Sequence, residues 1–254
     1  MNSQEFTNVG GRPAFRKFLR RGHSAEFRAE AAGLRALAAT GTVSTPAVLS
    51  VSDSDITTAR IVTGEPGVSA WETLGTQLAS LHRLKQPCFG FPADNFCGRT
   101  PQPNPQCDNG HEFYAVHRLQ YQGDLARGAG LLDAQASRQL DSLCRKLPEL
   151  VPDQGPALIH GDLWNGNVLF DEAGAPILID PACYWGWPEA ELAMCALFGG
   201  FPAAFFDSWE ASAAPEPRWR DRLPIYQLYH VLNHLNLFGG GYHGQAVAIL
   251  RAFA

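Results

Sequence analysis

The sequence lacks the long apolar run that a membrane-spanning helix needs. No stretch of about eighteen consecutive apolar residues occurs in the 254-residue chain. The first residues, MNSQEFTNVGG, also lack the basic segment and apolar core of a secretory signal. We therefore expect a cytoplasmic protein without a membrane partner.

Closely spaced cysteines are missing as well. The chain has six cysteines, and no two of them form a C-x-x-C pair: Cys88, Cys97, Cys107, Cys144, Cys183 and Cys195. Zinc frameworks usually use such pairs, and cytosolic proteins keep their thiols reduced. We expect free thiols rather than disulfides or a zinc site.

A long basic tract is the third absence. The net charge is −5, and the densest basic stretch is Arg16–Arg21. A nucleic-acid partner is therefore not indicated.

Internal repeats and low-complexity tracts are absent too. With 45% hydrophobic residues, the chain can build one large domain or two lobes that share a cleft.

Three short apolar runs frame the most informative part of the chain. Ala157–Ile159, Val168–Phe170 and Ile177–Ile179 predict a strand followed by a hairpin. The loop before the hairpin reads HGDLWNGN, and Asp180 follows the last run. Polar residues therefore stand where strands end, which is a common position for a site.

The polar residues of this segment have the types and the spacing of a phosphoryl-transfer site. Asp162 and Asn167 are separated by four residues, as in the H-R-D-x-x-x-x-N loop of kinases, and Asp180 takes the place of the D in D-F-G. Asn167 and Asp180 offer oxygen ligands for Mg²⁺. Asp162 is left to accept a proton from an attacking hydroxyl, with His160 orienting the loop. Taken singly, each could also be a turn former or a helix cap.

A second pair of charged residues is expected near the N-terminus. Glu5–Val9 and Ala14–Leu19 flank Gly10 and Gly11 and predict a hairpin, and Ser24 precedes a helix to about Ala39. The hairpin carries Lys17 and the helix carries Glu30. A strand lysine paired with a helix glutamate holds donor phosphates in kinases, although isolated charges of this kind more often lie in solvent.

The segments HGDLWNGN, DPACYWG and EAELAM resemble the fructosamine kinase (ketosamine 3-kinase) family, a branch of the aminoglycoside-phosphotransferase-like enzymes. TPQPN at 100–104 and IYQLYHVLN at 225–233 are similar to the family too, and the resemblance extends from about Pro13 to Arg251. It implies an α+β, bilobal protein-kinase-like fold. Residues 1–62 would form a small β-rich nucleotide-binding lobe, and residues 63–254 a larger, mostly helical catalytic lobe.

The resemblance also implies a reaction. ATP with Mg²⁺ would phosphorylate the 3-hydroxyl of a ketosamine, a fructosamine or ribulosamine adduct that is either free or protein-bound. Phosphorylation makes such an adduct labile, so the implied role is deglycation. Lys17 and Glu30 would clamp the nucleotide, Asn167 and Asp180 would bind metal and nucleotide, and Trp164 would form a wall for the sugar.

Two alternatives stay open at this stage. One is a phosphotransferase of the same fold that acts on an aminoglycoside or a choline-like amine. The other is a non-catalytic binding module, suggested because only sixteen residues precede Lys17, whereas the family has a further strand and a glycine-rich turn there. The resemblance thus implies either a shortened N-terminal lobe or a start site further upstream.

Other polar residues receive weaker assignments. Glu189 and Glu191 are expected to support the catalytic loop from a short helix. Arg118 is expected either in the cleft or on the surface, and Asn233 and Tyr242 are candidates for the acceptor pocket. Helices are expected from Ser69, over 109–128 and 134–147, and after Phe201, whereas 86–106 is expected to be a long ordered loop.

Overall fold

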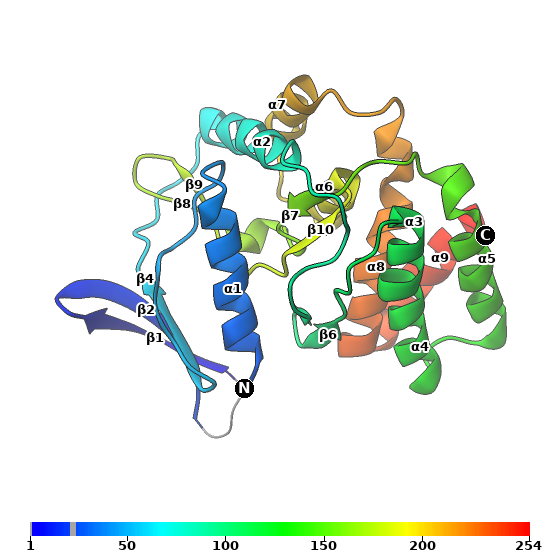
Figure 1. Cartoon of the computed structure of the whole chain (residues 1–254), viewed down its shortest axis with the longest axis horizontal. Helices are drawn as coiled ribbons and strands as arrows, with labels where there is room; N and C mark the ends of the chain where they lie inside the picture. The colour runs from blue at the N-terminus through cyan, green and yellow to red at the C-terminus, as the bar shows by residue number, and fades with distance from the viewer. Residues whose placement is uncertain (1, 21–23) are drawn as a thin grey trace.

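The computed structural model describes residues 2–20 and 24–254; Arg21 of the basic stretch lies outside them. A four-stranded antiparallel sheet with strand order β1-β2-β4-β3 occupies one end of the molecule (Figure 1). Its strands are β1 (Asn2–Val9), β2 (Arg12–Leu19), β3 (Val48–Val51) and β4 (Asp55–Ala59). The predicted N-terminal hairpin is confirmed.

Helix α1 (Glu26–Ala39) lies against this sheet. Its buried side chains Phe27, Ala31 and Leu34 form a small apolar cluster with Ile56 of β4. In the β1–β2 turn, Gly10 and Gly11 both have positive φ, at 58° and 82°, a conformation that glycine adopts without strain. The hairpin therefore presents Lys17 and the helix presents Glu30 from two packed elements.

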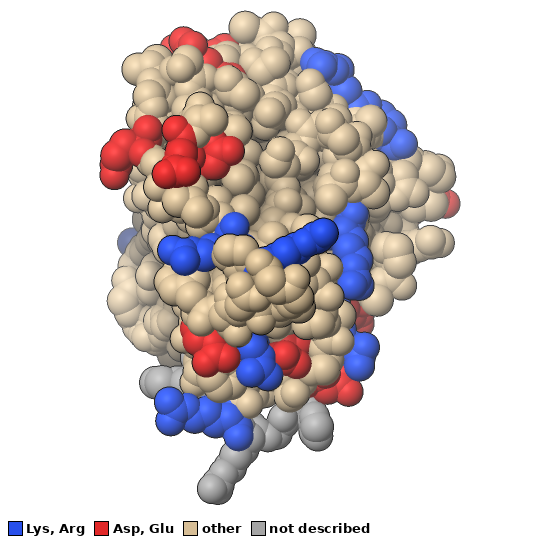
Figure 2. Space-filling model, turned by 90° about the vertical axis from the view of Figure 1, so that its left-hand side faces the viewer, with Lys and Arg blue, Asp and Glu red and all other residues tan. Residues whose placement is uncertain are grey.

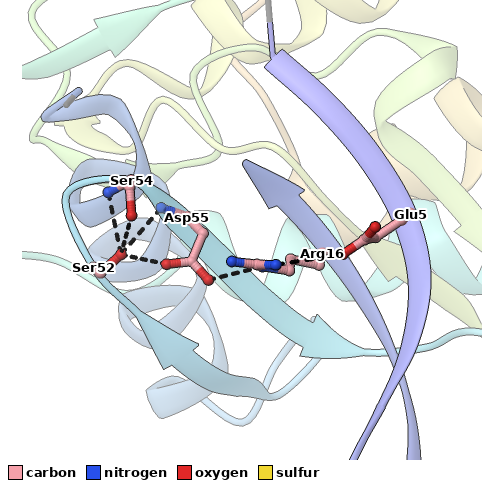
Figure 3. A network of polar contacts seen from close by, with 5 residues as sticks. All are labelled: Glu5, Arg16, Ser52, Ser54 and Asp55. Carbon is pink, nitrogen blue, oxygen red and sulfur yellow. Dashed lines mark hydrogen bonds and ion pairs between the residues drawn. The ribbon is translucent and has the colours of Figure 1, made fainter. Parts of the chain in front are cut away.

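A polar network connects β1, β2 and the β3–β4 turn (Figure 3). The Arg16 Nε donates to Asp55 at 3.0 Å, and its Nη1 reaches Glu5 on β1 at 3.4 Å. At the β3–β4 turn, the Ser52 hydroxyl donates to Asp55 and accepts from the backbone N–H of Ser54. Arg16 therefore balances acidic neighbours instead of forming an anion-binding surface.

The other end of the molecule is mostly helical (Figure 1). Its elements are α2 (Val68–His82), α3 (Gly110–Tyr114), the π-helical segment η1 (Ala115–Gln120), α4 (Tyr121–Gly128), α5 (Ala134–Leu150), α6 (Pro188–Leu197), α7 (Ala203–Ala213), α8 (Trp219–Phe238), η3 (Gly240–Tyr242) and α9 (His243–Phe253). These helices bury two apolar clusters, one around α5, α8 and α9 and one between α2, α6 and α7. The predicted helical regions are confirmed.

The segment rich in polar motifs has the predicted strand pattern. β7 (Ala157–Ile159) leads into a loop that contains the 3₁₀ turn η2 (Asn165–Asn167), and β8 (Val168–Phe170) pairs with β9 (Pro176–Leu178). The chain then returns beside β7 as β10 (Tyr184–Gly186). The hairpin brings Asn167, which ends η2, close to Asp180 because the backbone N–H of Ile179 donates to the Asn167 carbonyl at 3.0 Å.

The segment 86–106, expected to be a long ordered loop, also contains a short hairpin of β5 (Asn95–Cys97) and β6 (Thr100–Gln102). Both expectations for Arg118 were wrong. Its side chain is fully buried and donates to the carbonyl of Pro103 and to Oδ1 of Asn104, each at 2.7 Å. Its guanidinium carbon also lies 3.9 Å from the ring centroid of Tyr184. Arg118 therefore ties the hairpin segment to η1 and β10 from inside the core.

The surface of the sheet end carries interspersed charges. Figure 2 shows both basic and acidic side chains on this face, with uncharged areas between them. Among the described residues, no helix is both long and apolar enough to cross a membrane.

Candidate active site

Most of the predicted site residues line one cavity between the sheet end and the helical part. This central cavity, about 300 Å³ in volume, is lined by residues of both parts. Lys17 and Glu30 come from β2 and α1, whereas Asp162, Asn167 and Asp180 come from the segment that starts with β7. The structure thus brings together side chains that are up to 163 positions apart.

Lys17 contacts two carboxylates, one from its own part of the molecule and one from the other. Its Nζ donates to Oε1 of Glu30 at 2.9 Å and also contacts Oδ1 of Asp180. Burial lowers the pKa of Lys17, but the two carboxylates outweigh it and the pKa is raised overall. Burial, together with the charge of Asp180, raises the pKa of Glu30 to about 7. The ammonium therefore stays charged and points toward the metal-ligand candidate Asp180.

The position of Asp180 depends on an unusual backbone conformation. Asp180 has a φ of 55°, which is uncommon for a residue other than glycine. Helix α1 approaches the next residue closely, since a Cβ added to Gly33 would lie only 2.8 Å from Cγ of Pro181. The Sγ of Cys183 also lies within 3.7 Å of the Gly33 carbonyl. A glycine at 33 therefore allows the helix that carries Glu30 to pack directly on the Asp180 segment.

The loop after β7 is held from behind by a buried carboxylate. Glu191 on α6 is 1% exposed, and it accepts hydrogen bonds from the backbone N–H groups of His160 at 2.5 Å and Gly161 at 3.0 Å. Gly161 has a φ of 83°, and an added Cβ would lie 2.2 Å from the Ala182 carbonyl oxygen. The turn that aims Asp162 therefore requires both a glycine and an acceptor beneath it.

His160 lies behind the loop and does not line the cavity. Its ring is fully buried; Nε2 donates to the Ile179 carbonyl at 2.8 Å, and Nδ1 accepts from the Asp162 backbone N–H at 3.3 Å. Burial lowers the pKa of His160, which keeps the ring neutral. The neutral ring links the loop to the end of β9, so His160 can position Asp162 but cannot touch a bound substrate.

Asn167 and Asp162 contact each other through the amide. The Asn167 Nδ2 donates to the Asp162 carbonyl at 2.8 Å, and it lies 3.5 Å from Oδ2 of Asp162. The amide oxygen is thereby left for a cation, and the carboxylate of Asp180, which Lys17 contacts through Oδ1, lines the same cavity. Burial raises the pKa of Asp162 to about 8, and the charges of Asp180 and Glu191 add to this effect. A carboxylate with a raised pKa is a stronger general base.

A second cavity opens from the central one between the sheet and the β8–β9 hairpin. This junction cavity, about 390 Å³ in volume, shares Lys17, Glu30 and Asp180 with the central cavity. Its other walls are mainly apolar, and the connecting segment 60–63 runs along it. The walls include Phe15, Leu34, Ala59, Ile61, Val62, Leu169 and Ile179. A flat aromatic ring with few charges would suit such walls.

A third cavity lies on the opposite side of Asp162. This distal cavity, about 530 Å³ in volume, shares Gly98, Asp162 and Trp164 with the central cavity. Asn233 and Tyr242, the two candidates for the acceptor pocket, both line this cavity, and Phe198 and Phe238 add aromatic surface. Trp164 is 40% exposed and borders both cavities. Asp162 thus stands at the boundary between the central and distal cavities.

Sequence reasoning missed the amides that hold the segment after Asp180. The Nε2 of Gln102 donates to the Ala182 carbonyl at 3.0 Å, the Nδ2 of Asn95 donates to that of Cys183 at 2.8 Å, and Tyr229 donates to Gln102 at 2.6 Å. The sequence shows the TPQPN motif, but it does not show which groups the amide side chains of the motif bind. Glu189 was also placed incorrectly, since its carboxylate binds Arg222 on α8 and not the loop.

The chain is similar to known proteins over most of its length. A family model described as fructosamine kinase matches residues 1–253. The chain is 42% identical over 233 residues to a probable ketoamine kinase of Synechocystis, with 89% of this chain and 77% of the relative covered. It is 37% identical over 257 residues to the ketosamine-3-kinase of Mus musculus, with 89% and 82% covered.

Solved structures confirm the predicted fold. A putative fructosamine-3-kinase from Thermobifida fusca superimposes with a TM-score of 0.91 at 32% identity, over 99% of this chain and 92% of that chain. An aminoglycoside phosphotransferase superimposes with a TM-score of 0.64 at 19% identity, over 100% and 92%. The fold is therefore the α+β protein-kinase-like fold, with a small sheet-containing lobe and a larger helical lobe.

Proposed function

This chain belongs to the fructosamine kinase family, and we propose that it transfers the γ-phosphoryl group of ATP to the 3-hydroxyl of a ketosamine. A fructosamine or ribulosamine adduct is the acceptor, and the product is a phosphorylated adduct that decomposes to release the amine. The role is deglycation.

One observation supports this proposal most strongly. The junction, central and distal cavities follow one another, with Lys17, Glu30 and Asp180 at the first boundary and Asp162 and Trp164 at the second. A donor base, its phosphates and an acceptor need this order of compartments. Phosphoryl transfer depends mainly on such positioning and on charge neutralisation.

The nucleotide would occupy the first two cavities. The adenine would lie between the apolar walls of the junction cavity, near the backbone of residues 60–63, and Lys17 would approach the phosphates with Glu30 holding its ammonium. The oxygens of Asn167 and Asp180 form a hard donor set that suits Mg²⁺. Bound there, Mg²⁺ would neutralise charge that develops on the phosphates.

Asp162 would act on the acceptor hydroxyl. As the hydroxyl oxygen attacks the γ-phosphorus, its proton passes to the carboxylate of Asp162, and ADP leaves on the side of Lys17. The raised pKa of Asp162 favours proton acceptance. Glu191 and His160 would keep the carboxylate aimed by fixing the backbone on either side of it.

The distal cavity favours a sugar-bearing acceptor over a polycationic aminoglycoside. Asp162 is the single carboxylate among the described residues that line this cavity, whereas a polyamine needs several anionic partners. The aromatic rim of Trp164, Phe198 and Tyr242 suits the C–H faces of a sugar and the hydrocarbon part of an amine adduct. Choline would also suit aromatic walls, so choline remains the competitor to test.

We propose that the two ends of the chain have different roles. Residues 1–62 would form the nucleotide-binding lobe, and residues 63–254 would supply the catalytic loop and the acceptor cavity. Lys17 and Glu30 are the contribution of the smaller lobe to the central cavity.

An acceptor panel tests the proposal. The purified chain is incubated with ATP and MgCl₂ and with fructosyl-lysine, ribulosyl-lysine, kanamycin or choline, and ADP release and ³¹P spectra are recorded. We expect phosphate transfer to one or both ketosamines, with EDTA abolishing it. Transfer to kanamycin or choline alone would show that the acceptor is not a ketosamine. Nucleotide binding without transfer to any acceptor would favour the non-catalytic module.

A further inference from the structure

Three potential metal ligands converge beside the reacting carboxylate. The Sγ of Cys97 on β5, a carboxylate oxygen of Asp162 and a ring nitrogen of His230 on α8 all lie within 4.8 Å of one another. The Sγ of Cys97 and the Nδ1 of His230 are 3.9 Å apart. Because these two residues are 133 positions apart in the chain, no spacing pattern in the sequence indicates the cluster.

The distances suit a thiophilic cation. Zinc binds thiolate sulfur at about 2.3 Å and imidazole nitrogen at about 2.0–2.1 Å, so a tetrahedral ion holds two such ligands about 3.6 Å apart. The 3.9 Å between the Sγ of Cys97 and the Nδ1 of His230 is close to this value, and the other separations in the cluster, at most 4.8 Å, would shorten by at most about 1.4 Å on binding. Thiolate, imidazole and carboxylate together form a typical donor set for Zn²⁺.

The cluster differs in chemistry from the proposed magnesium site. Asn167 and Asp180 offer only oxygen atoms, whereas Cys97 and His230 offer sulfur and nitrogen, which Mg²⁺ binds poorly. Cys97 and Asp162 both line the distal cavity, so a cation can reach them from solvent. His230 is 4% exposed and Cys97 is 1% exposed, which would leave a bound cation facing the cavity through its fourth position only.

We propose that Cys97, Asp162 and His230 bind one Zn²⁺ ion in a site that shares its carboxylate with the phosphoryl-transfer reaction. Binding converts the Cys97 thiol to a thiolate, which bonds to zinc while its proton is released to solvent. Occupancy engages the Asp162 carboxylate and places a cation in the distal cavity, so the acceptor is excluded. This inhibitory consequence rests on the proposed function; the binding itself does not.

Cobalt spectroscopy tests the binding on the full-length chain without nucleotide or magnesium. Addition of Co²⁺ alone should produce one equivalent of a thiolate-to-cobalt charge-transfer band, and Zn²⁺ should displace it. The band should be lost in Cys97→Ser and kept in Cys88→Ser, a matched control whose half-buried thiol contacts Asp108 instead. An absent band in the wild type, or a band that survives in Cys97→Ser, would overturn the proposal, as would its loss in Cys88→Ser.

Two measurements keep the test independent of any folding defect in the variant. Thermal unfolding compares the variants with the wild type, and Cys97→Ala replaces Cys97→Ser if the hydroxyl is not tolerated. Proton release on addition of Zn²⁺ to the wild type requires no variant. We expect at least about one proton per zinc at a pH where the thiol is protonated, since any proton on Asp162 is released as well, and release of none would contradict thiolate ligation.

Kinetics test the inhibitory consequence separately. Zn²⁺ should inhibit competitively against the ketosamine, and the inhibitory concentration should rise at least about tenfold in Cys97→Ser, since even loss of an outer-sphere partner has an effect of this size. Equal inhibition of Cys97→Ser, or competition against Mg²⁺ instead, would assign the inhibition to the oxygen ligands. If no acceptor is phosphorylated, the proposed function fails, while the cobalt spectrum still decides whether the site exists.

Discussion

Replacing Glu191 by glutamine should separate positioning of the catalytic loop from its chemistry. The buried carboxylate accepts from the N–H groups of both His160 and Gly161. Glutamine keeps one acceptor oxygen and turns an NH₂ group toward the other donor, so one charge-assisted hydrogen bond is lost and one buried N–H is left without an acceptor. Such a loss costs about 1.5–3 kcal/mol. We expect the free energy of unfolding to fall by that amount.

The same change should reduce turnover more than nucleotide binding. A reacting group displaced by about 1 Å can lower the rate by about 100-fold, and Asp162 follows directly after the two anchored residues. The kcat for a ketosamine should therefore fall by about 10- to 100-fold, with little change in KM for ATP, because Lys17 and Asp180 are not attached to Glu191. Steady-state kinetics and urea denaturation followed by circular dichroism measure the two effects.

Glu189→Gln is the matched control for this experiment. Glu189 lies on the same helix and is equally buried at 1% exposure, but it binds Arg222 instead of the loop. Its substitution should lower stability while kcat stays close to that of the wild type. If Glu191→Gln has wild-type stability and turnover, or if Glu189→Gln loses as much kcat, the anchoring role assigned to Glu191 is refuted.

Three further predictions concern other parts of the site and the sheet. Asp180→Ala should weaken binding of Mg²⁺-ATP far more than binding of metal-free nucleotide, as measured by calorimetry; equal weakening would contradict its role as a metal ligand. Gly161→Ala should destabilise the fold by at least about 1–3 kcal/mol, because its φ of 83° is strained for alanine; a wild-type melting temperature would contradict this. The hydrogen bond from Ser52, helped by Arg16, lowers the pKa of Asp55, so its stabilisation is complete above the unfolded pKa of about 3.9 and is lost as pH falls through the lower folded pKa. Asp55→Asn should lower the free energy of unfolding by less than about 1 kcal/mol at neutral pH and should weaken its dependence on pH in acid, as measured by urea titrations. An unchanged pH dependence would count against the network of Figure 3.

The local part of this structure was predictable from the sequence. The segments that flank Gly10 and Gly11 predicted the β1–β2 hairpin, and two short apolar runs predicted the β8–β9 hairpin. The positions of Asp162, Asn167 and Asp180 followed from where the predicted strands end. Such features depend on residues that are close in the chain, so a short apolar run and a turn signal suffice.

The tertiary partners of buried polar groups were not predictable. Arg118 is charged and lies on a helix, which indicated cleft or surface, yet its guanidinium is buried, donates to Pro103 and Asn104, and lies against the ring of Tyr184. The amide of Gln102 binds a carbonyl 80 positions away. Nothing in a local pattern specifies which distant group satisfies a buried donor, although most buried donors in a stable fold have a partner.

The most direct test of the account compares Asp162→Asn with the wild type in a single-turnover reaction with Mg²⁺-ATP and a ketosamine. Asparagine preserves the shape of the side chain but cannot accept the hydroxyl proton. We expect the rate of phosphoryl transfer to fall by about 10²- to 10⁴-fold, with the affinity for Mg²⁺-ATP and the melting temperature essentially unchanged. Transfer at the wild-type rate by Asp162→Asn would contradict the central claim that this carboxylate accepts the proton of the attacking hydroxyl.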